Sequence, residues 1–207
     1  MCCRYFIRES DPDLLPIIDA ALKSPLIARF AKVRPAPLVR FGEVKPTDLV
    51  AVIASDRQQK ATVFPMTWGF KVPGRSAPLI NARSETASEK QSFSEAWKQH
   101  CCIIPASWYY EWQHLPKEDG RSTTSTKYAI QPKDTTVTYL CGLYRIENGL
   151  PVFVILTREP SPDISHIHDR MPLILPQETI RDWVNPAVKP EDLLPYALTA
   201  MAAEKVG

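Results

Sequence analysis

Residues 102–112 read CIIPASWYYEW, a stretch rich in β-branched and aromatic side chains. This composition is typical of a β-strand that packs against a hydrophobic core. One carboxylate, Glu111, stands between Tyr110 and Trp112. Because side chains alternate along a strand, Glu111 lies on the face opposite to these two rings. It is therefore either an outward polar residue or, if it is buried, a carboxyl group with a raised pKa that suits proton transfer.

Runs of the same kind recur along the chain, separated by short breaks that proline or polar residues mark. They predict a mostly antiparallel sheet that curls into a barrel or sandwich. Helical patterns interrupt the strands, so the predicted class is α+β, with a β-barrel-like core and peripheral helices. The expected strands cover residues 3–7, 49–54, 61–68, 79–81, 102–112, 127–131, 136–146 and 152–157, and the expected helices cover residues 11–22, 26–31, 85–99, 177–184 and a segment after Glu191.

The composition is that of a globular protein, with 44% hydrophobic residues in a chain of 207. This is ample for a buried core, and we expect one domain over residues 1–207. The Ser/Thr-rich residues 117–126 are expected to form a loop tip. Signal-peptide and membrane-spanning runs are absent, since the longest apolar stretches, such as residues 49–54, are too short. The sequence therefore predicts a cytoplasmic protein without a membrane partner.

Cysteine usage and charge narrow the function classes. Of the five cysteines, four form two adjacent pairs, which predicts reduced thiols rather than a disulfide framework. The net charge of +2 excludes a strong overall basic field. Residues 25–47 nevertheless carry five Lys/Arg side chains against Glu43 alone. Such a local basic patch is either a solvated face or a surface for a phosphate backbone.

Cys2 directly follows the initiator methionine. Methionine is commonly removed before a small residue, and the new terminus then carries an amine and a thiol on adjacent carbons. The amine has a pKa of roughly 7.7 to 8, so about a tenth of it is neutral near pH 7. Such an aminothiol can capture an aldehyde as a Schiff base and then close a thiazolidine ring through sulfur. The alternative is that Cys2 is a small buried residue at the start of a strand.

Two further stretches carry polar groups that suit either structure or chemistry. Residues 78–86 read PLINARSET, in which an apolar strand ends at Asn81 and a helix follows. Asn81 is either a cap or an uncharged donor and acceptor for a backbone or ligand, while Arg83 can reach a phosphate. Residues 166–172 read HIHDRMP, in which His168 suits proton transfer.

The two histidines of that segment also raise the possibility of a metal site. His166 and His168 are two positions apart, so on an extended segment they face the same way. A zinc site needs at least a third protein ligand, and adjacent residues such as Cys101 and Cys102 point to opposite sides of a strand. We therefore predict no bound metal and no cofactor.

Taken together and in this order, these stretches resemble the SRAP family, the SOS-response-associated peptidases or abasic-site processing proteins. The family pattern runs MCGR at the amino terminus, then WG, NAR-ET, a YEW-type motif and H-RMP. The resemblance spans residues 1 to about 185, and the joint occurrence of the motifs is specific although each motif alone is weak. The corresponding residues here are MCCR (1–4), WG (68–69), NARSET (81–86), YEW (110–112) and HDRMP (168–172).

The resemblance implies a barrel-like α+β fold and covalent linkage to abasic sites through the amino-terminal cysteine. This is a crosslinking activity with lyase character. Carried over by position, Cys2 would be the nucleophile, and Asn81 would hold the amino terminus or the opened sugar. Glu111 would transfer protons, and His168 would assist sugar opening.

The resemblance also implies the partner, which is single-stranded DNA with an abasic site, bound in a positively charged channel. The protein would then act as a monomer in the DNA damage (SOS) response, in the cytoplasm and at the nucleoid when DNA is damaged. Arg4 and Arg83 would hold the phosphates that flank the lesion. The expected DNA-binding residues are Arg4, Pro46, Trp68 and Arg83.

Three positions depart from the family pattern. Cys3 replaces the glycine, only Pro46 remains of an NxAP-type segment that here reads EVKP (43–46), and no second tryptophan follows Trp68 and Gly69. Two other functions stay open. One is a cysteine peptidase whose action can be limited to self-processing at Met1. The other is a non-covalent single-strand binding module in which Cys2 is a core residue.

Overall fold

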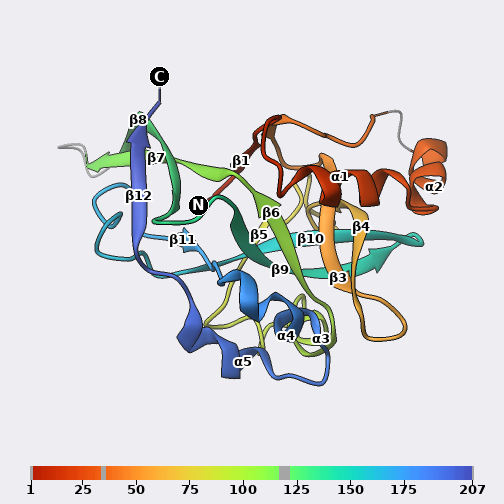
Figure 1. Cartoon of the computed structure of the whole chain (residues 1–207). Helices are drawn as coiled ribbons and strands as arrows, with labels where there is room; N and C mark the ends of the chain where they lie inside the picture. The colour runs from red at the N-terminus through yellow and green to blue at the C-terminus, as the bar shows by residue number, and fades with distance from the viewer. Residues whose placement is uncertain (1, 34–35, 117–121, 207) are drawn as a thin grey trace.

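The structure is a computed structural model that describes residues 2–33, 36–116 and 122–206. Five strands form a closed barrel in the order β10, β4, β3, β6 and β9, and β9 pairs again with β10 (Figure 1). All pairs are antiparallel except β10 with β4. The barrel confirms the predicted α+β class with a mostly antiparallel β core. Its strands are β3 (Leu49–Ser55), β4 (Ala61–Trp68), β6 (Cys101–Ala106), β9 (Thr138–Glu147) and β10 (Leu150–Arg158).

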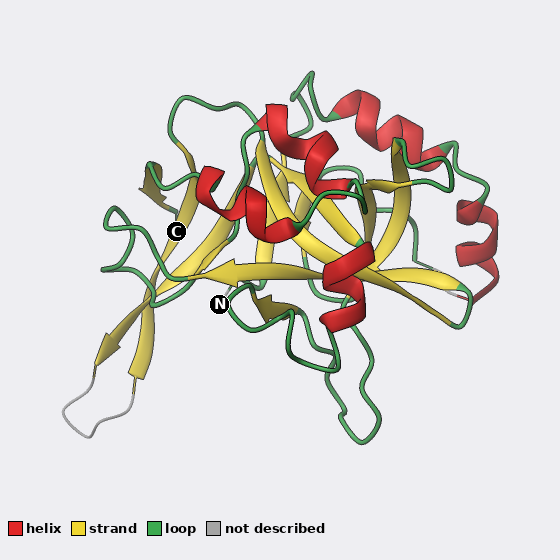
Figure 2. Ribbon diagram, turned by 90° about the horizontal axis from the view of Figure 1, so that it is seen from below, coloured by secondary structure: helices red, strands yellow, loops and turns green. Residues whose placement is uncertain are grey.

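A second sheet of five strands lies beside the barrel, in the order β12, β8, β7, β1 and β2. All of its pairs are antiparallel. In Figure 2 the β7–β8 ribbon extends away from the body of the protein. The sequence did not predict the last strand, which pairs with β8. The strands are β1 (Arg4–Ile7), β2 (Gly42–Val44), β7 (Trp108–Pro116), β8 (Ser122–Pro132) and β12 (Met201–Lys205).

Two short strands and several helices complete the fold. β5 (Asn81–Arg83) pairs in parallel with β10, and β11 (Met171–Pro172) pairs with the end of β10 in the antiparallel sense. In Figure 1, α1 and α2 lie on one side of the barrel and α3, α4 and α5 on the other. The helices are α1 (Leu15–Leu22), α2 (Leu26–Val33), α3 (Ser94–Gln99), η1 (Gln177–Thr179), α4 (Ile180–Val184), α5 (Pro190–Leu193) and η2 (Leu194–Tyr196).

The barrel strands are packed tightly at a glycine and under a helix. Gly142 in β9 lies opposite Cys102, and a Cβ atom there would lie 2.6 Å from the Val154 carbonyl oxygen. All residues of β6 are buried. Trp183 of α4 covers this strand and donates a hydrogen bond from Nε1 to the Cys102 carbonyl (3.0 Å). Both faces of β6 are covered, which explains why its sequence is continuously hydrophobic instead of alternating with polar residues.

The predicted single strand over residues 102–112 is two strands that meet at a corner. β6 ends at Ala106, and β7 begins at Trp108. Between them, Ser107 donates its backbone N–H to the Phe6 carbonyl (2.8 Å). Its hydroxyl oxygen accepts a hydrogen bond from the Arg8 N–H (2.9 Å). These bonds to β1 turn the chain from the barrel into the second sheet.

Three other predicted elements differ from the structure. The helix expected over residues 85–99 is confined to α3, because residues 84–93 form successive turns. The strand expected over residues 79–81 lies at 81–83, where pairing with β10 is available. Of the expected loop 117–126, residues 122–126 belong to β8, whose pairing with β7 overrides the polar composition; residues 117–121 lie outside the described part.

Candidate active site

Asn81 connects the start of the chain to the barrel. It begins β5, where it pairs with Ile155 of β10. Its side-chain Nδ2 donates a hydrogen bond to the Cys2 carbonyl oxygen at 2.9 Å. The Asn81 amide therefore holds the backbone of Cys2 from β5, which is itself paired with the barrel strand β10.

Cys2 is buried, with none of its surface exposed. The thiol Sγ lies 3.6 Å from the Arg4 carbonyl oxygen, to which it can donate a weak hydrogen bond. Burial raises the pKa of the thiol well above its ordinary value, and the negative charge of Glu111 raises it further. The sulfur in this state is a protonated thiol, so it needs a base before it can act as a nucleophile.

Glu111 is a carboxyl group inside the protein. It lies in β7 opposite Tyr128 of β8, and only 3% of the residue is exposed. One oxygen, Oε1, accepts a hydrogen bond from the backbone N–H of Trp112 at 3.3 Å. Burial raises the pKa of Glu111 above its ordinary value. A raised pKa brings a carboxyl group closer to the range in which it can both donate and accept a proton at the working pH.

His168 faces Glu111 from the opposite side of the site. Its Nε2 lies 4.0 Å from Glu111 Oε1, and 6% of the residue is exposed. Nδ1 accepts a hydrogen bond from the Arg170 backbone N–H (3.0 Å) and lies 2.8 Å from Asp169 Oδ1. One nitrogen cannot accept from the amide and donate to the carboxylate at once. A ring with its only hydrogen on Nε2 accepts from Arg170, and a ring with a hydrogen on Nδ1 donates to Asp169, so Nδ1 has a partner in either form.

Arg170 positions the His168 loop, a role that sequence reasoning missed. The guanidinium binds both Glu85 oxygens, at 2.9 and 2.8 Å, and also the Thr157 carbonyl at 2.7 Å. These bonds tie the loop to β10 and to the turn after β5. Glu85 belongs to NARSET (81–86) and Arg170 to HDRMP (168–172), but no sequence pattern indicates that these two side chains bind each other. A bidentate pair of this kind is geometrically specific.

The expected DNA-binding residues lie in different environments. Arg4 Nε binds Glu43 Oε1 at 3.0 Å, and Lys127 Nζ binds the other Glu43 oxygen at 2.8 Å. Arg83 is exposed on β5, and no ion pair holds it within the described part of the chain. Pro46 is half-buried in the turn between β2 and β3. Arg83 is thus available to an anion, while Arg4 already has a carboxylate partner.

The expectation for Trp68 is corrected by its burial. The ring has no exposed surface, stacks with Phe153 at 6.1 Å and donates from Nε1 to the Ile80 carbonyl at 2.9 Å. It therefore belongs to the core and cannot stack on a base directly. The following Gly69 has φ +121°, and a Cβ atom there would lie 2.9 Å from Pro78 Cβ. The WG pair is thus explained by packing.

The described residues form no metal site beside the groups named above. Among residues 2–33, 36–116 and 122–206, no cluster of three or more His, Cys, Asp or Glu side chains could hold a metal ion. No helix in that part is long and apolar enough to cross a membrane.

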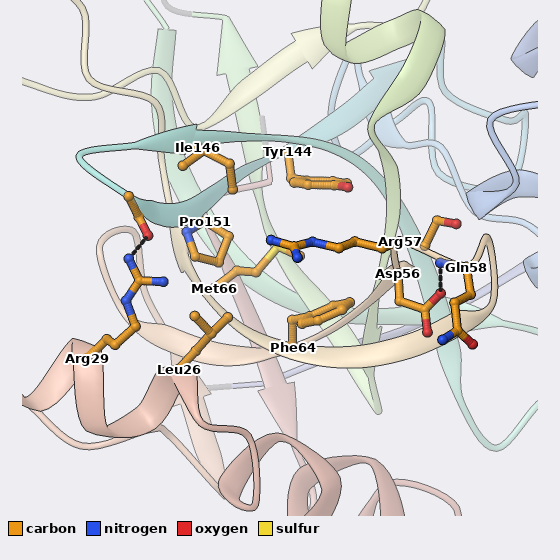
Figure 3. A pocket seen from close by; sticks show the side chains of 12 residues that line it. Leu26, Arg29, Asp56, Arg57, Gln58, Phe64, Met66, Tyr144, Ile146 and Pro151 are labelled. Atoms are coloured by element: carbon orange, nitrogen blue, oxygen red, sulfur yellow. Dashed lines mark hydrogen bonds between the residues drawn. The ribbon is translucent and has the colours of Figure 1, made fainter.

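A cavity of about 460 Å³ lies between α2 and the β3–β4 and β9–β10 hairpins, with Phe64 and Tyr144 on opposite walls (Figure 3). None of the predicted site residues lines it.

The family model of the SOS response associated peptidases (SRAP) matches residues 1–206. The protein belongs to the SRAP family. Relatives of this SRAP protein include the abasic site processing protein YoaM of Bacillus subtilis, which is 36% identical over 62% of this chain and 59% of its own length. The protein YedK of Escherichia coli, with the same descriptive name, is 29% identical over 89% of this chain and 79% of its own. This chain thus spans less than two thirds of the Bacillus relative.

Solved structures share the fold of this SRAP protein. A phage-related protein of Bordetella bronchiseptica superposes with a TM-score of 0.71 at 22% identity, covering 99% of this chain and 94% of its own. A protein of Bacteroides thetaiotaomicron gives the same TM-score and identity over 100% of this chain and 92% of its own. The barrel and the second sheet are therefore a recurrent arrangement.

We predict that Glu111→Gln changes the pH dependence of stability. Because the pKa of Glu111 is raised in the folded state, the folded protein binds more protons than the unfolded protein above pH 4.5. Stability from this group is complete below pH 4.5 and is lost as the pH rises through the folded-state pKa. The free energy of unfolding, measured in urea, should therefore increase for Glu111→Gln relative to the wild type as the pH rises from 4 to 7. The exposed Glu89→Gln should show no such gain, and a constant difference for Glu111→Gln would contradict the prediction.

Proposed function

We propose that this protein captures abasic sites in single-stranded DNA through a covalent bond to Cys2, and thereby shields the lesion during the response to DNA damage. The observation that carries the proposal is the hydrogen bond between Asn81 and Cys2, at the place where the pairing of β1 with β7 brings the start of the chain beside Glu111. Asn81 of β5 binds the Cys2 carbonyl oxygen, while Glu111 of β7 and His168 of the loop before β11 face each other at 4.0 Å. The curated relatives YoaM and YedK are named abasic site processing proteins.

Removal of Met1 is part of this proposal, and Met1 lies outside the described residues. The open-chain sugar of an abasic site carries an aldehyde at C1′. The freed Cys2 amine adds to C1′, the hydroxyl that forms leaves as water, and an imine remains. The thiol sulfur then adds to C1′ while its proton passes to the nitrogen. One water is released and no atom changes its overall oxidation level, so no cofactor is required.

The described residues supply the proton transfers that these steps need. The raised pKa of Glu111 favours the protonated carboxyl group, and this form can protonate the departing hydroxyl. The carboxylate that results can take the proton of the buried Cys2 thiol. We assign to His168, whose Nε2 lies 4.0 Å from Glu111 Oε1, proton exchange with Glu111 and assistance in opening the sugar ring. Asn81 holds the Cys2 carbonyl, so that amine and thiol reach one carbon with a high effective molarity.

The imine stage also allows a lyase reaction. An imine at C1′ makes the hydrogens at C2′ more acidic, and loss of one of them expels the phosphate at C3′ and cleaves the strand. Closure of the thiazolidine ring removes the imine and so competes with this elimination. We therefore assign strand cleavage as a side reaction of the same site.

The principal test is formation of an adduct that resists denaturation. Protein whose Met1 removal is verified by intact mass is incubated with a single-stranded oligonucleotide that carries one abasic site. We expect a product with the mass of protein plus oligonucleotide minus one water. Cys2→Ala and a form extended at the amino terminus should give none, because one lacks the thiol and the other lacks the α-amine at Cys2.

Other outcomes of the same experiment separate the alternatives. Absence of an adduct with the wild type would contradict covalent capture, and retained gel-shift binding would then favour a non-covalent module. Cleavage of an unrelated peptide that Cys2→Ala abolishes would favour a peptidase, in line with the family's description. Adduct formation by Cys3 is excluded if Cys3→Ala reacts at the wild-type rate.

Glu111→Gln should slow adduct formation by a factor on the order of 10² to 10⁴, the usual contribution of a general acid or base. Glutamine has nearly the same shape but does not exchange a proton, so binding of undamaged single strand should stay within about twofold. Single-turnover rates and fluorescence anisotropy measure the two quantities. An equal loss in both would indicate that Glu111 has a structural role only.

Glu43→Gln should strengthen binding of undamaged single-stranded DNA. The carboxylate holds both Arg4 and Lys127, two cations that a phosphate would otherwise contact. Freeing one phosphate contact should steepen the slope of log K against log salt by about 0.7. Glu147→Gln is the matched control, because that carboxylate pairs with Arg145 on the barrel. Unchanged or weaker binding by Glu43→Gln would show that Arg4 and Lys127 do not meet the DNA.

A further inference from the structure

The outer face of the second sheet carries a row of aromatic rings. Alternation along β1 and β7 buries Tyr5 and Tyr109 fully in the core. Phe6 and Trp108, which pair with each other across the two strands, lie on the opposite face and are half-buried. Phe6 and Trp108 therefore remain partly accessible on this face, whereas Tyr110 on the same face is buried.

The rings form a continuous cluster that runs toward the candidate active site. Phe6 and Trp108 are stacked, with their centroids 4.6 Å apart and an angle of 7° between their planes. Tyr110 meets both rings edge-on, at 6.3 and 6.4 Å. Tyr110 directly precedes Glu111 along β7. The Tyr110 end of the cluster thus lies next to Glu111 along β7 but on the other face of the strand, and the Trp108 end lies further out on the sheet.

Cations lie over the faces of these rings. The Arg8 guanidinium lies 5.1 Å from the centre of the Trp108 ring, and Lys127 Nζ lies 3.7 Å from the centre of the Tyr110 ring. Arg8 is exposed. Aromatic rings interleaved with cations are the usual surface for single-stranded nucleic acid, since bases stack on the rings and phosphates bind the cations.

A cavity of about 370 Å³ opens beside Trp108. This volume lies within the range of small-ligand sites. The cavity exists because β8 and β12 present small side chains there. Gln131 and Glu204 supply polar atoms that can meet the edge of a base, and a carboxylate accepts hydrogen bonds from a base amino group. Its lining includes Arg8, Trp108, Ala129, Gln131, Ala202 and Glu204.

We propose that this cavity is a subsite for an unpaired nucleobase of the bound strand, with the base against Trp108 and its phosphate on Arg8. The inference rests on the proposed function and extends the DNA surface from Cys2 across the outer face of the second sheet. The combination of an aromatic wall, an exposed cation and polar groups for a base edge favours a nucleotide over an apolar ligand.

The distance from the lesion suits a strand of modest length. Phe6, the partner of Trp108, lies four positions after Cys2 in a chain that is extended from Arg4 onward. Four extended residues span about 13 Å. Stacked nucleotides rise about 3.4 Å each, so the subsite would take a base within about four nucleotides of the abasic site.

The test uses undamaged single strands, so it does not depend on adduct chemistry. Anisotropy of fluorescein-labelled oligonucleotides of 4 and 12 nucleotides is measured with the whole protein. Trp108→Ala should weaken binding of the 12-mer about tenfold, because stacking on an aromatic ring contributes appreciably per base. Arg8→Ala should reduce the salt slope by about 0.7. Binding of the 4-mer should change much less in both variants.

A second variant and two controls keep the result interpretable if Trp108→Ala folds poorly. Ala202→Phe fills the cavity from an exposed position of β12 and should weaken 12-mer binding without removing a core contact. Tyr196→Ala and Arg57→Ala, an exposed ring and an exposed cation elsewhere, should bind as the wild type does. Wild-type binding of the 12-mer by both Arg8→Ala and Ala202→Phe would overturn the subsite.

The same experiment separates this inference from the proposed function. Loss of 12-mer binding in the variants, with no adduct at an abasic site, would support the subsite and contradict covalent capture. An adduct formed with a 12-mer whose affinity none of the variants changes would support capture and overturn the subsite.

Discussion

The antiparallel pairing of β1 with β7 is the constraint on which the candidate site depends. It sets Arg4 opposite Tyr110 and so brings the first residues of the chain beside Glu111. The corner at Ser107 makes this pairing possible, because it turns the chain out of the barrel and bonds to β1 on both sides. A start of the chain held only by its own contacts would remain mobile, whereas a strand in a sheet is fixed.

The site combines groups that are costly to bury, and their partners come from several elements of the fold. An ionised carboxylate in the interior is unfavourable without compensation, so the raised pKa of Glu111 reflects its place in the fold. Arg170 is buried as well, but Glu85 and Thr157 accept hydrogen bonds from its two terminal nitrogens. That network holds the His168 loop against β10, so the position of His168 relative to Glu111 depends on an ion pair that makes no contact with Cys2 itself.

The proposed DNA surface depends on local charge rather than on net charge. With a net charge of +2, the chain has little overall attraction for a phosphate backbone. Glu43 further offsets two of the cations nearest the site, and Arg8 lies over an aromatic ring. Affinity would then come largely from stacking on the rings of the second sheet, which tolerates any base sequence. Such binding suits a protein that must recognise a lesion in many sequence contexts.

The sequence by itself determined the class and most strands, and it singled out Cys2, Asn81, Glu111 and His168 as candidates, because strand periodicity and ordered motifs are local properties. Only the tertiary structure decided which of them meet. The Glu85–Arg170 pair joins positions far apart in the chain, and no local pattern predicts it. Trp68 was expected to contact DNA, but the structure buries it in the core. The sequence could not distinguish the two, because an aromatic residue is equally typical of a covered and of an open strand face. Strand β12 was missed because its pairing with β8, and not its alanine-rich sequence, makes it a strand.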